Sequence, residues 1–145
     1  MELTSPAFSA NQLIPVNHTH QGAGISPPLM VSGAPEGTES LALIVHDPDA
    51  PSGDFTHWLI WNISGSTGVL PEDHIPTGAV QGTNDFGAVG YGAPAPPTGT
   101  HHYVFNVYAL NCELPLKAGA HLGDLQQAME GHILAQADLV GVVTA

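Results

Sequence analysis

The sequence predicts an all-β fold, a β-sandwich of antiparallel sheets with one helix near the C-terminal end. The chain contains 17 glycines and 13 prolines among 145 residues, spread between short apolar runs. This distribution is typical of many turns joining short strands. Only one segment has the apolar spacing of an amphipathic helix, and it comes late in the chain. Many strands and one late helix favour a sandwich over a parallel α/β sheet.

Several apolar runs bounded by turn residues have the pattern of strands. They comprise residues 29–31, 41–46, 57–63, 102–110 and 139–143. The run 102–110 alternates most clearly, with Tyr103, Phe105 and Val107 on one face. Both of its faces carry bulky side chains, so we expect this strand to lie in the middle of a sheet.

The helix is predicted over about residues 124–137. Leu125, Met129 and Ile133 recur at four-residue spacing and define its apolar face. Asp124 and Gln127 have the spacing of a capping box at its start. No repeat and no long linker divides the chain, so residues 1–145 are expected to form a single domain.

The charge balance excludes some partners. Thirteen acidic residues face a single cation, Lys117, and the formal net charge is −12. Nucleic acids and anionic membrane surfaces need Lys or Arg clusters, so neither is an expected partner. Cys112 is the only cysteine, which excludes an internal disulfide.

Membrane and export signals are also missing from the sequence. No run of about 18 apolar residues occurs, so no membrane insertion is expected. Residues 1–12 contain neither a basic residue nor an apolar core of the kind found in secretory signals. The cytoplasm is therefore the expected location.

A proline-braced acidic loop follows the apolar run 41–46. In Asp47-Pro48-Asp49-Ala50-Pro51 the two prolines fix the backbone on either side of Asp49. A carboxylate at a strand end in a stiff loop is well placed to line a concavity. Asx turns formed by Asp47 and Asp49 are the alternative, and spacing alone favours that interpretation.

Histidines begin the next two predicted strands. His57 can donate to a ligand oxygen, although a histidine at the edge of the core is the alternative. His101 and His102 must lie on opposite faces of an extended chain, so at most one points inward. His101 shares its face with Tyr103, and these two side chains could share a pocket.

Other site chemistries lack their sequence patterns. There is no H-E-x-x-H zinc motif, no G-x-S-x-G nucleophile turn and no phosphate-binding G-x-x-x-x-G-K loop. No metal site, no covalent catalytic residue and no cofactor is therefore expected.

Four ordered motifs resemble the phosphatidylethanolamine-binding protein family, also called Raf kinase inhibitor-like proteins. Asp47-Pro48-Asp49-Ala50-Pro51 followed by His57-Trp58 resembles its first signature. Gly90-Tyr91-Gly92-Ala93-Pro94-Ala95-Pro96-Pro97, followed by His101 and Tyr103, resembles the second. Two further segments, at residues 26–29 and 128–135, are similar to the bacterial and archaeal branch.

This resemblance implies a Greek-key β-sandwich with a small anion site at one edge of its central sheet, and often a homodimer. The Ala50–Pro51 bond would be cis, as is common in the family. The ligand-binding residues would be Asp47, Asp49, Pro51, His57, Pro94, His101 and Tyr103.

The chain also departs from the family pattern at three positions. His102 stands where the family usually has arginine. Ala93 and Ala95 replace a glycine and a cysteine of the prokaryotic loop. The Cβ of Ala93 would restrict the approach of a ligand to the backbone.

Three functions remain open on these grounds. The leading hypothesis is a non-enzymatic binding or regulatory protein for a small phosphate- or carboxylate-like anion, such as a phospholipid headgroup. The second is an acid–base hydrolase that uses Asp47, His57 and His101. The third is a kinase or protease inhibitor that acts by protein–protein contact.

Overall fold

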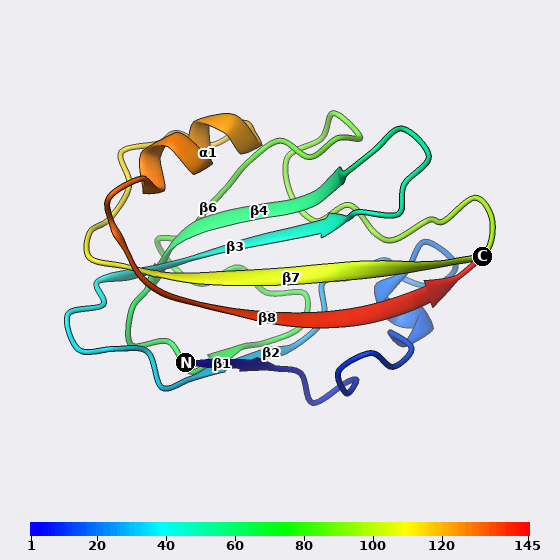
Figure 1. Cartoon of the computed structure of the whole chain (residues 1–145), viewed down its shortest axis with the longest axis horizontal. Helices are drawn as coiled ribbons and strands as arrows, with labels where there is room; N and C mark the ends of the chain where they lie inside the picture. The colour runs from blue at the N-terminus through cyan, green and yellow to red at the C-terminus, as the bar shows by residue number, and fades with distance from the viewer.

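The computed structural model, which describes residues 1–145, consists of two antiparallel sheets and one α-helix (Figure 1). The larger sheet has the strand order β6-β4-β3-β7-β8. Its strands are β6 (Val80–Gln81), β4 (Phe55–Ser64), β3 (Ser40–Asp47), β7 (Thr100–Leu110) and β8 (Ile133–Thr144). The smaller sheet has the order β1-β2-β5. Its strands are β1 (Glu2–Thr4), β2 (Leu29–Ser32) and β5 (Val69–Leu70). A short 3-10 helix, η1 (Val16–His18), and the α-helix α1 (Leu122–Met129) complete the fold.

The larger sheet contains a Greek key. Strands β3, β4 and β6 are neighbours in the sheet, with β5 of the smaller sheet between β4 and β6 along the chain, and β7 returns to pair beside β3. The spatial order is β7-β3-β4-β6. All five predicted strand segments lie within β2, β3, β4, β7 and β8. Strand β7 pairs with β3 on one side and β8 on the other, so its predicted central position is confirmed.

The smaller sheet covers one face of the larger sheet, and α1 covers part of the other face, as Figure 1 shows. Leu41, Leu43 and Val45 of β3 belong to the core between the two sheets. The alternating residues Ala42 and Ile44 instead pack in a second cluster with residues of α1. The near-continuous apolar run of β3 follows from this burial on both faces.

The helix is shorter than the predicted 124–137. Helix α1 ends at Met129, and Gly131, at a φ of +80°, turns the chain before β8 begins at Ile133. Ala135 and Ala137 then pair with β7, and this ladder prevails over the local apolar spacing. The capping box also begins earlier than predicted, at His121 and not at Asp124. Asp124 is the third residue of the helix, and its carboxylate accepts a hydrogen bond from the backbone N–H of His121 at 3.0 Å.

The Ala50–Pro51 bond is trans, contrary to the expected cis bond. Gly53 N donates to Ala50 O at 3.0 Å, which closes a turn with Pro51 in its second position. A trans proline fits that position, whereas a cis proline belongs one residue later in a turn.

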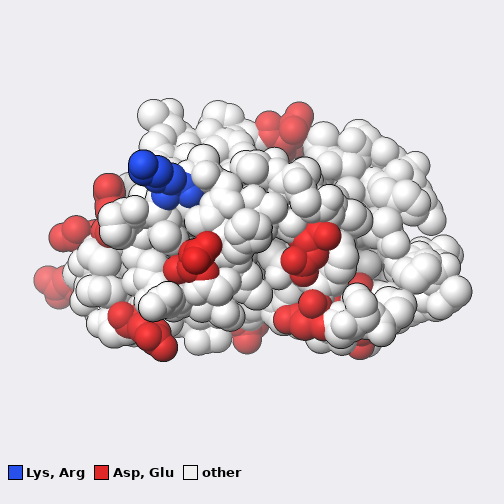
Figure 2. All heavy atoms as spheres, turned by 90° about the horizontal axis from the view of Figure 1, so that it is seen from above, with Lys and Arg blue, Asp and Glu red and all other residues white.

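No helix of the structure has the length and apolar composition needed to cross a bilayer. The acidic side chains are scattered over the face in Figure 2 and do not form a single block.

Candidate functional site

The pocket lies where β3 ends and where its two neighbours, β4 and β7, begin. Because these strands are antiparallel, Asp47 at the end of β3 lies opposite Phe55 at the start of β4. His46, one residue earlier, lies opposite Val104 of β7. The pocket has a volume of about 240 Å³. It is lined by Asp47, Ala50, Pro51, Ser52, Phe55, His57, Phe86, Ala95, Pro96, Pro97, His101 and Tyr103.

A β-bulge sets the direction of the His57 side chain. Val45 pairs with Trp58, but the next residue of β3, His46, pairs with Thr56, so His57 is the extra residue of β4. Trp58 belongs to the core between the sheets, and the His57 ring lies 5.1 Å from that of Tyr103, a member of the same core. The bulge thus turns two consecutive side chains to one face, a common use of bulges near functional sites.

His57 is held by two hydrogen bonds to one residue. Its Nδ1 donates to the carbonyl oxygen of Gly92 at 2.6 Å, and Gly92 N donates back to His57 O at 2.7 Å. A carbonyl can only accept, so Nδ1 carries the proton of the neutral ring. Burial lowers the pKa of His57 below its ordinary value of 6.5 and favours this neutral form.

Asp47 and His101 form a buried pair. His101 Nδ1 donates to Asp47 Oδ2 at 2.7 Å, and Asp47 Oδ1 accepts from the backbone N–H of Asp49 at 2.8 Å. The side chains are 4% exposed for Asp47 and 9% exposed for His101. Burial and the charge of Asp47 raise the pKa of the adjacent Tyr103 above 10.0, so its hydroxyl stays protonated at neutral pH.

The second ring nitrogen of each histidine, Nε2, is available to a ligand. Neither His57 Nε2 nor His101 Nε2 has a hydrogen-bond partner in the protein, since both rings bind through Nδ1. Every buried side-chain nitrogen and oxygen has a partner, so these two atoms reach solvent. Both residues line the pocket, and we infer that their Nε2 atoms face it.

Two further carboxylates fasten the outside of the loop. Asp49 Oδ2 accepts from His102 Nδ1 at 2.7 Å and from His102 N at 2.8 Å. Those hydrogen bonds lower the pKa of Asp49 below 3.8. Asp54 Oδ1 accepts from His46 Nδ1 at 2.7 Å. The acidic loop is thus tied to β3 and β7 by three Asp–His pairs.

The structure separates the predicted ligand-binding residues into two groups. Asp47, Pro51, His57, His101 and Tyr103 meet in the pocket. Asp49 points outward, with 41% of its side chain exposed, and braces the loop from the surface. Pro94 is buried outside the pocket lining, where its carbonyl accepts from His20 N at 3.1 Å.

Sequence reasoning missed the apolar wall of the pocket. Phe55 and Phe86 line it together with Pro96 and Pro97. Phe55 lies two residues before the segment predicted as a strand, and its position beside Asp47 depends on strand pairing. Phe86 belongs to a turn-broken stretch whose sequence carries no signal that it folds back onto β4.

Comparisons with known proteins give consistent matches over nearly the whole chain. A family model described as phosphatidylethanolamine-binding protein matches residues 4–144. A UPF0098 protein of Methanothermobacter thermautotrophicus is 46% identical, over 98% of this chain and 97% of its own. A UPF0098 protein of Pyrococcus horikoshii is 45% identical, over 95% of this chain and 74% of its own.

Two solved structures have the same fold. A Chlamydia trachomatis protein, described as a homologue of the phosphatidylethanolamine-binding protein, has a TM-score of 0.96 and 42% identity. The alignment covers 99% of this chain and 97% of that one. YbcL of E. coli, described as a member of the mammalian PEBP family, has a TM-score of 0.92 and 34% identity, over 99% and 98% of the two chains.

Proposed function

The chain belongs to the phosphatidylethanolamine-binding protein family, and we propose that it is a non-enzymatic binding or regulatory protein for a small anion. The anionic group is a phosphate or a carboxylate, free or as part of a phospholipid headgroup. The observation that carries this proposal is the pair of unpartnered Nε2 atoms, on His57 and His101, that open into one pocket.

The same geometry makes binding depend on protons. No Lys or Arg lines the pocket, so the only side-chain donors to the anion are imidazoles and hydroxyls, besides backbone N–H groups. Neutral His57 carries its proton on Nδ1, and Nε2 becomes a donor only when the ring gains a second proton. Because burial lowers the pKa of His57, binding of the anion at neutral pH requires that the ring take up a proton at the same time. Affinity should therefore fall by up to about tenfold per pH unit as the pH rises.

Nuclear magnetic resonance titration tests the proposal. Inorganic phosphate, acetate and phosphoethanolamine are added at pH 6 and at pH 8 while the imidazole signals are followed. We expect the signals of His57 and His101 to shift with saturation, at lower concentration at pH 6. The exposed His132, which bonds Asn111, serves as the internal control and should not shift. Unchanged His57 and His101 signals with all three anions at both pH values would contradict the proposal.

Acid–base hydrolysis is a second candidate, favoured by the Asp47–His101 pair. A carboxylate that accepts from Nδ1 and leaves Nε2 free is the arrangement that orients a general base. Ser52 and Tyr103 supply hydroxyls to the pocket lining. A screen with nitrophenyl esters and phosphates tests this candidate. Turnover that is lost in His101→Gln supports hydrolysis, and the absence of any turnover by the unaltered chain contradicts it.

The assembly and location stay proposals too. A homodimer rests on the family resemblance, and analytical ultracentrifugation at several concentrations would test it. Inhibition of a kinase or a protease by direct contact would be tested by using this chain to capture partners from host extract. The control is the same capture with the pocket occupied by an anion. A cytoplasmic location would be tested by fractionation of the host cell.

A further inference from the structure

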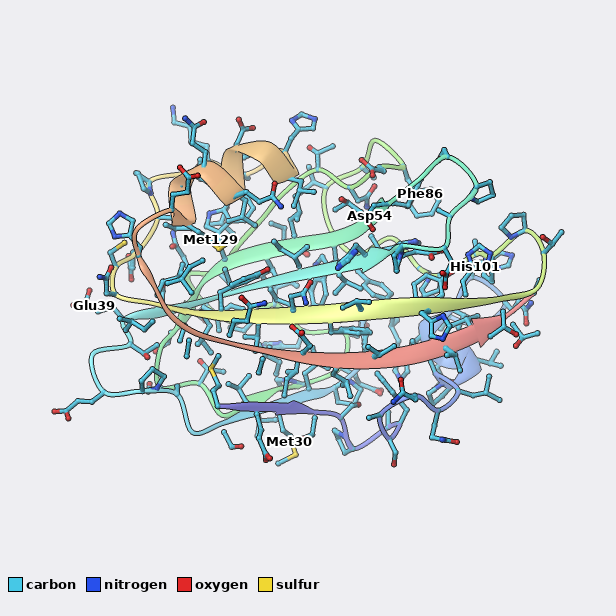
Figure 3. All side chains as sticks on the ribbon, viewed as in Figure 1. Met30, Glu39, Asp54, Phe86, His101 and Met129 are labelled. Atoms are coloured by element: carbon cyan, nitrogen blue, oxygen red, sulfur yellow. The ribbon has the colours of Figure 1, made fainter.

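Phe86 is a large apolar side chain that stays open to solvent beside the pocket. It lines the pocket, and 54% of its surface is exposed. It lies in a turn bounded by a bridge between Thr83 and Val89. Asp85 of this turn accepts a hydrogen bond from Thr56 N of β4 at 2.7 Å. Figure 3 shows Phe86 and His101 at the same end of the molecule.

The backbone that carries Phe86 is fixed by the buried side chain of Asn84. Its Oδ1 accepts from Phe86 N at 2.9 Å and from Ala88 N at 3.3 Å. Its Nδ2 donates to Gly90 O at 3.0 Å. A buried amide with this many partners holds one conformation of the turn, so the exposure of Phe86 does not reflect a loose segment.

The Phe86 ring also packs against two neighbouring aromatic side chains. Its centroid lies 4.8 Å from that of Phe55 and 5.4 Å from that of His57, both in edge-to-face geometry. A Cβ at Gly92 would come within 2.5 Å of the Phe86 ring, so the absence of a side chain there makes room for the ring. The rest of the ring forms a rigid wall toward the pocket, next to His57.

We infer that the ligand is a small aromatic anion, and this inference rests on the proposed function. The anionic group would bind at His57 Nε2 and His101 Nε2, and the attached ring would pack on Phe86. An exposed aromatic held in place beside a polar site is typical of a ligand surface, and aromatic pairs prefer the edge-to-face contacts that this wall offers. Phe86 is then the residue that determines specificity.

The size and charge of the pocket restrict the ligand further. Its volume of about 240 Å³ is at or below the low end of small-molecule sites, which suits one ring and one anionic group. No Lys or Arg lines the pocket and Asp47 adds a carboxylate to it, so protonation of His57 would supply only one positive charge. A monoanion is therefore favoured over a dianion.

The test compares acetate, benzoate and hexanoate, with inorganic phosphate and phenyl phosphate as a second pair, by calorimetry at pH 6. We expect benzoate and phenyl phosphate to bind about tenfold more tightly than acetate and phosphate. We expect hexanoate, which has apolar surface but no ring, to lie between acetate and benzoate. Phe86→Ala should abolish the preference for benzoate over acetate, measured as the ratio of the two dissociation constants in the same variant.

Val89→Ala is the matched control, since Val89 lies on the same turn, is 56% exposed and does not line the pocket. It should keep the full preference. Phe86→Leu, which keeps apolar bulk, replaces Phe86→Ala if thermal melting shows that the alanine variant does not fold. Acetate binding without a benzoate preference, equal binding of hexanoate and benzoate, or a preference that survives at Phe86→Ala overturns the inference alone. Absence of binding by all five anions overturns the proposed function as well.

Discussion

His101 and His102 are neighbours on β7, and each donates from Nδ1 to an aspartate of the same loop at 2.7 Å. Their surroundings differ. The side chains of His101 and Asp47 are 9% and 4% exposed, whereas those of His102 and Asp49 are 55% and 41% exposed. The alternation of a strand directs one pair into the pocket and the other to solvent. Hydrogen bonds of the same length should therefore contribute differently to the free energy of unfolding.

The largest expected difference between the two pairs is the loss of stability when the carboxylate of each is removed in turn. Asp47→Ala leaves the buried Nδ1 of His101 without its acceptor, and we expect the free energy of unfolding to fall by about 3 kcal/mol. Asp49→Ala, the matched control, should lower it by less than about 1 kcal/mol, since water replaces an exposed partner. Urea denaturation at pH 7 measures both, and equal losses would show that burial does not distinguish the pairs.

Removal of the two imidazoles should separate them in binding. His101→Gln removes an Nε2 that faces the pocket, so we expect acetate affinity at pH 6 to fall about tenfold or more, the worth of one charge-assisted hydrogen bond. His102→Gln changes only the outer face of β7 and should bind acetate as the unaltered chain does. Calorimetry gives both constants, and a similar loss in both variants would place the ligand outside the pocket.

The same alternation explains what could be predicted from the sequence. Period two in residues 101–109 correctly placed His101 and Tyr103 on one face, because that inference needs only local geometry. The bulge at His57 could not be predicted, since every residue from Phe55 to Trp61 suits a strand in either register. Phe86 joins the pocket through Asn84 and Gly92, contacts that no local pattern encodes.

The helical spacing gave a wrong prediction at the end of the helix, where pairing between strands decides the structure. Leu125, Met129 and Ile133 have helical spacing, yet only the first two lie in α1. Ile133 pairs with Leu110 across the sheet and is 45% exposed, so its apolar side chain does not belong to the buried helix face. Gly131, in the left-handed region at a φ of +80°, is the local feature that marks the change.

His57 extends the comparison to a buried histidine without a carboxylate partner. Its pKa is lowered by burial, so below pH 6.5 the unfolded chain binds a proton that the folded chain does not. Stability should be unaffected by His57 above pH 6.5 and should fall below it, by at most about 1.4 kcal/mol per pH unit. Urea denaturation from pH 8 to pH 5 should show a smaller fall in His57→Gln. An identical pH profile in the variant would mean that His57 takes up its proton freely in the folded state.

The smallest expected effect concerns the outer pair and its sensitivity to solution conditions. Hydrogen bonds from His102 N and Nδ1 lower the pKa of Asp49, so the stability that they add is present above pH 3.8 and is lost as the pH falls through the lower folded value. We expect the stability difference between the unaltered chain and Asp49→Asn to lie below about 1 kcal/mol at pH 7 and to shrink in 1 M salt, where screening acts over about 3 Å. The corresponding difference for Asp47→Asn should persist in salt, because the buried pair is shielded from ions. Urea denaturation of the three chains at low and high salt measures this contrast. Equal salt sensitivity of the two differences would contradict the assignment of one pair to the interior and the other to solvent.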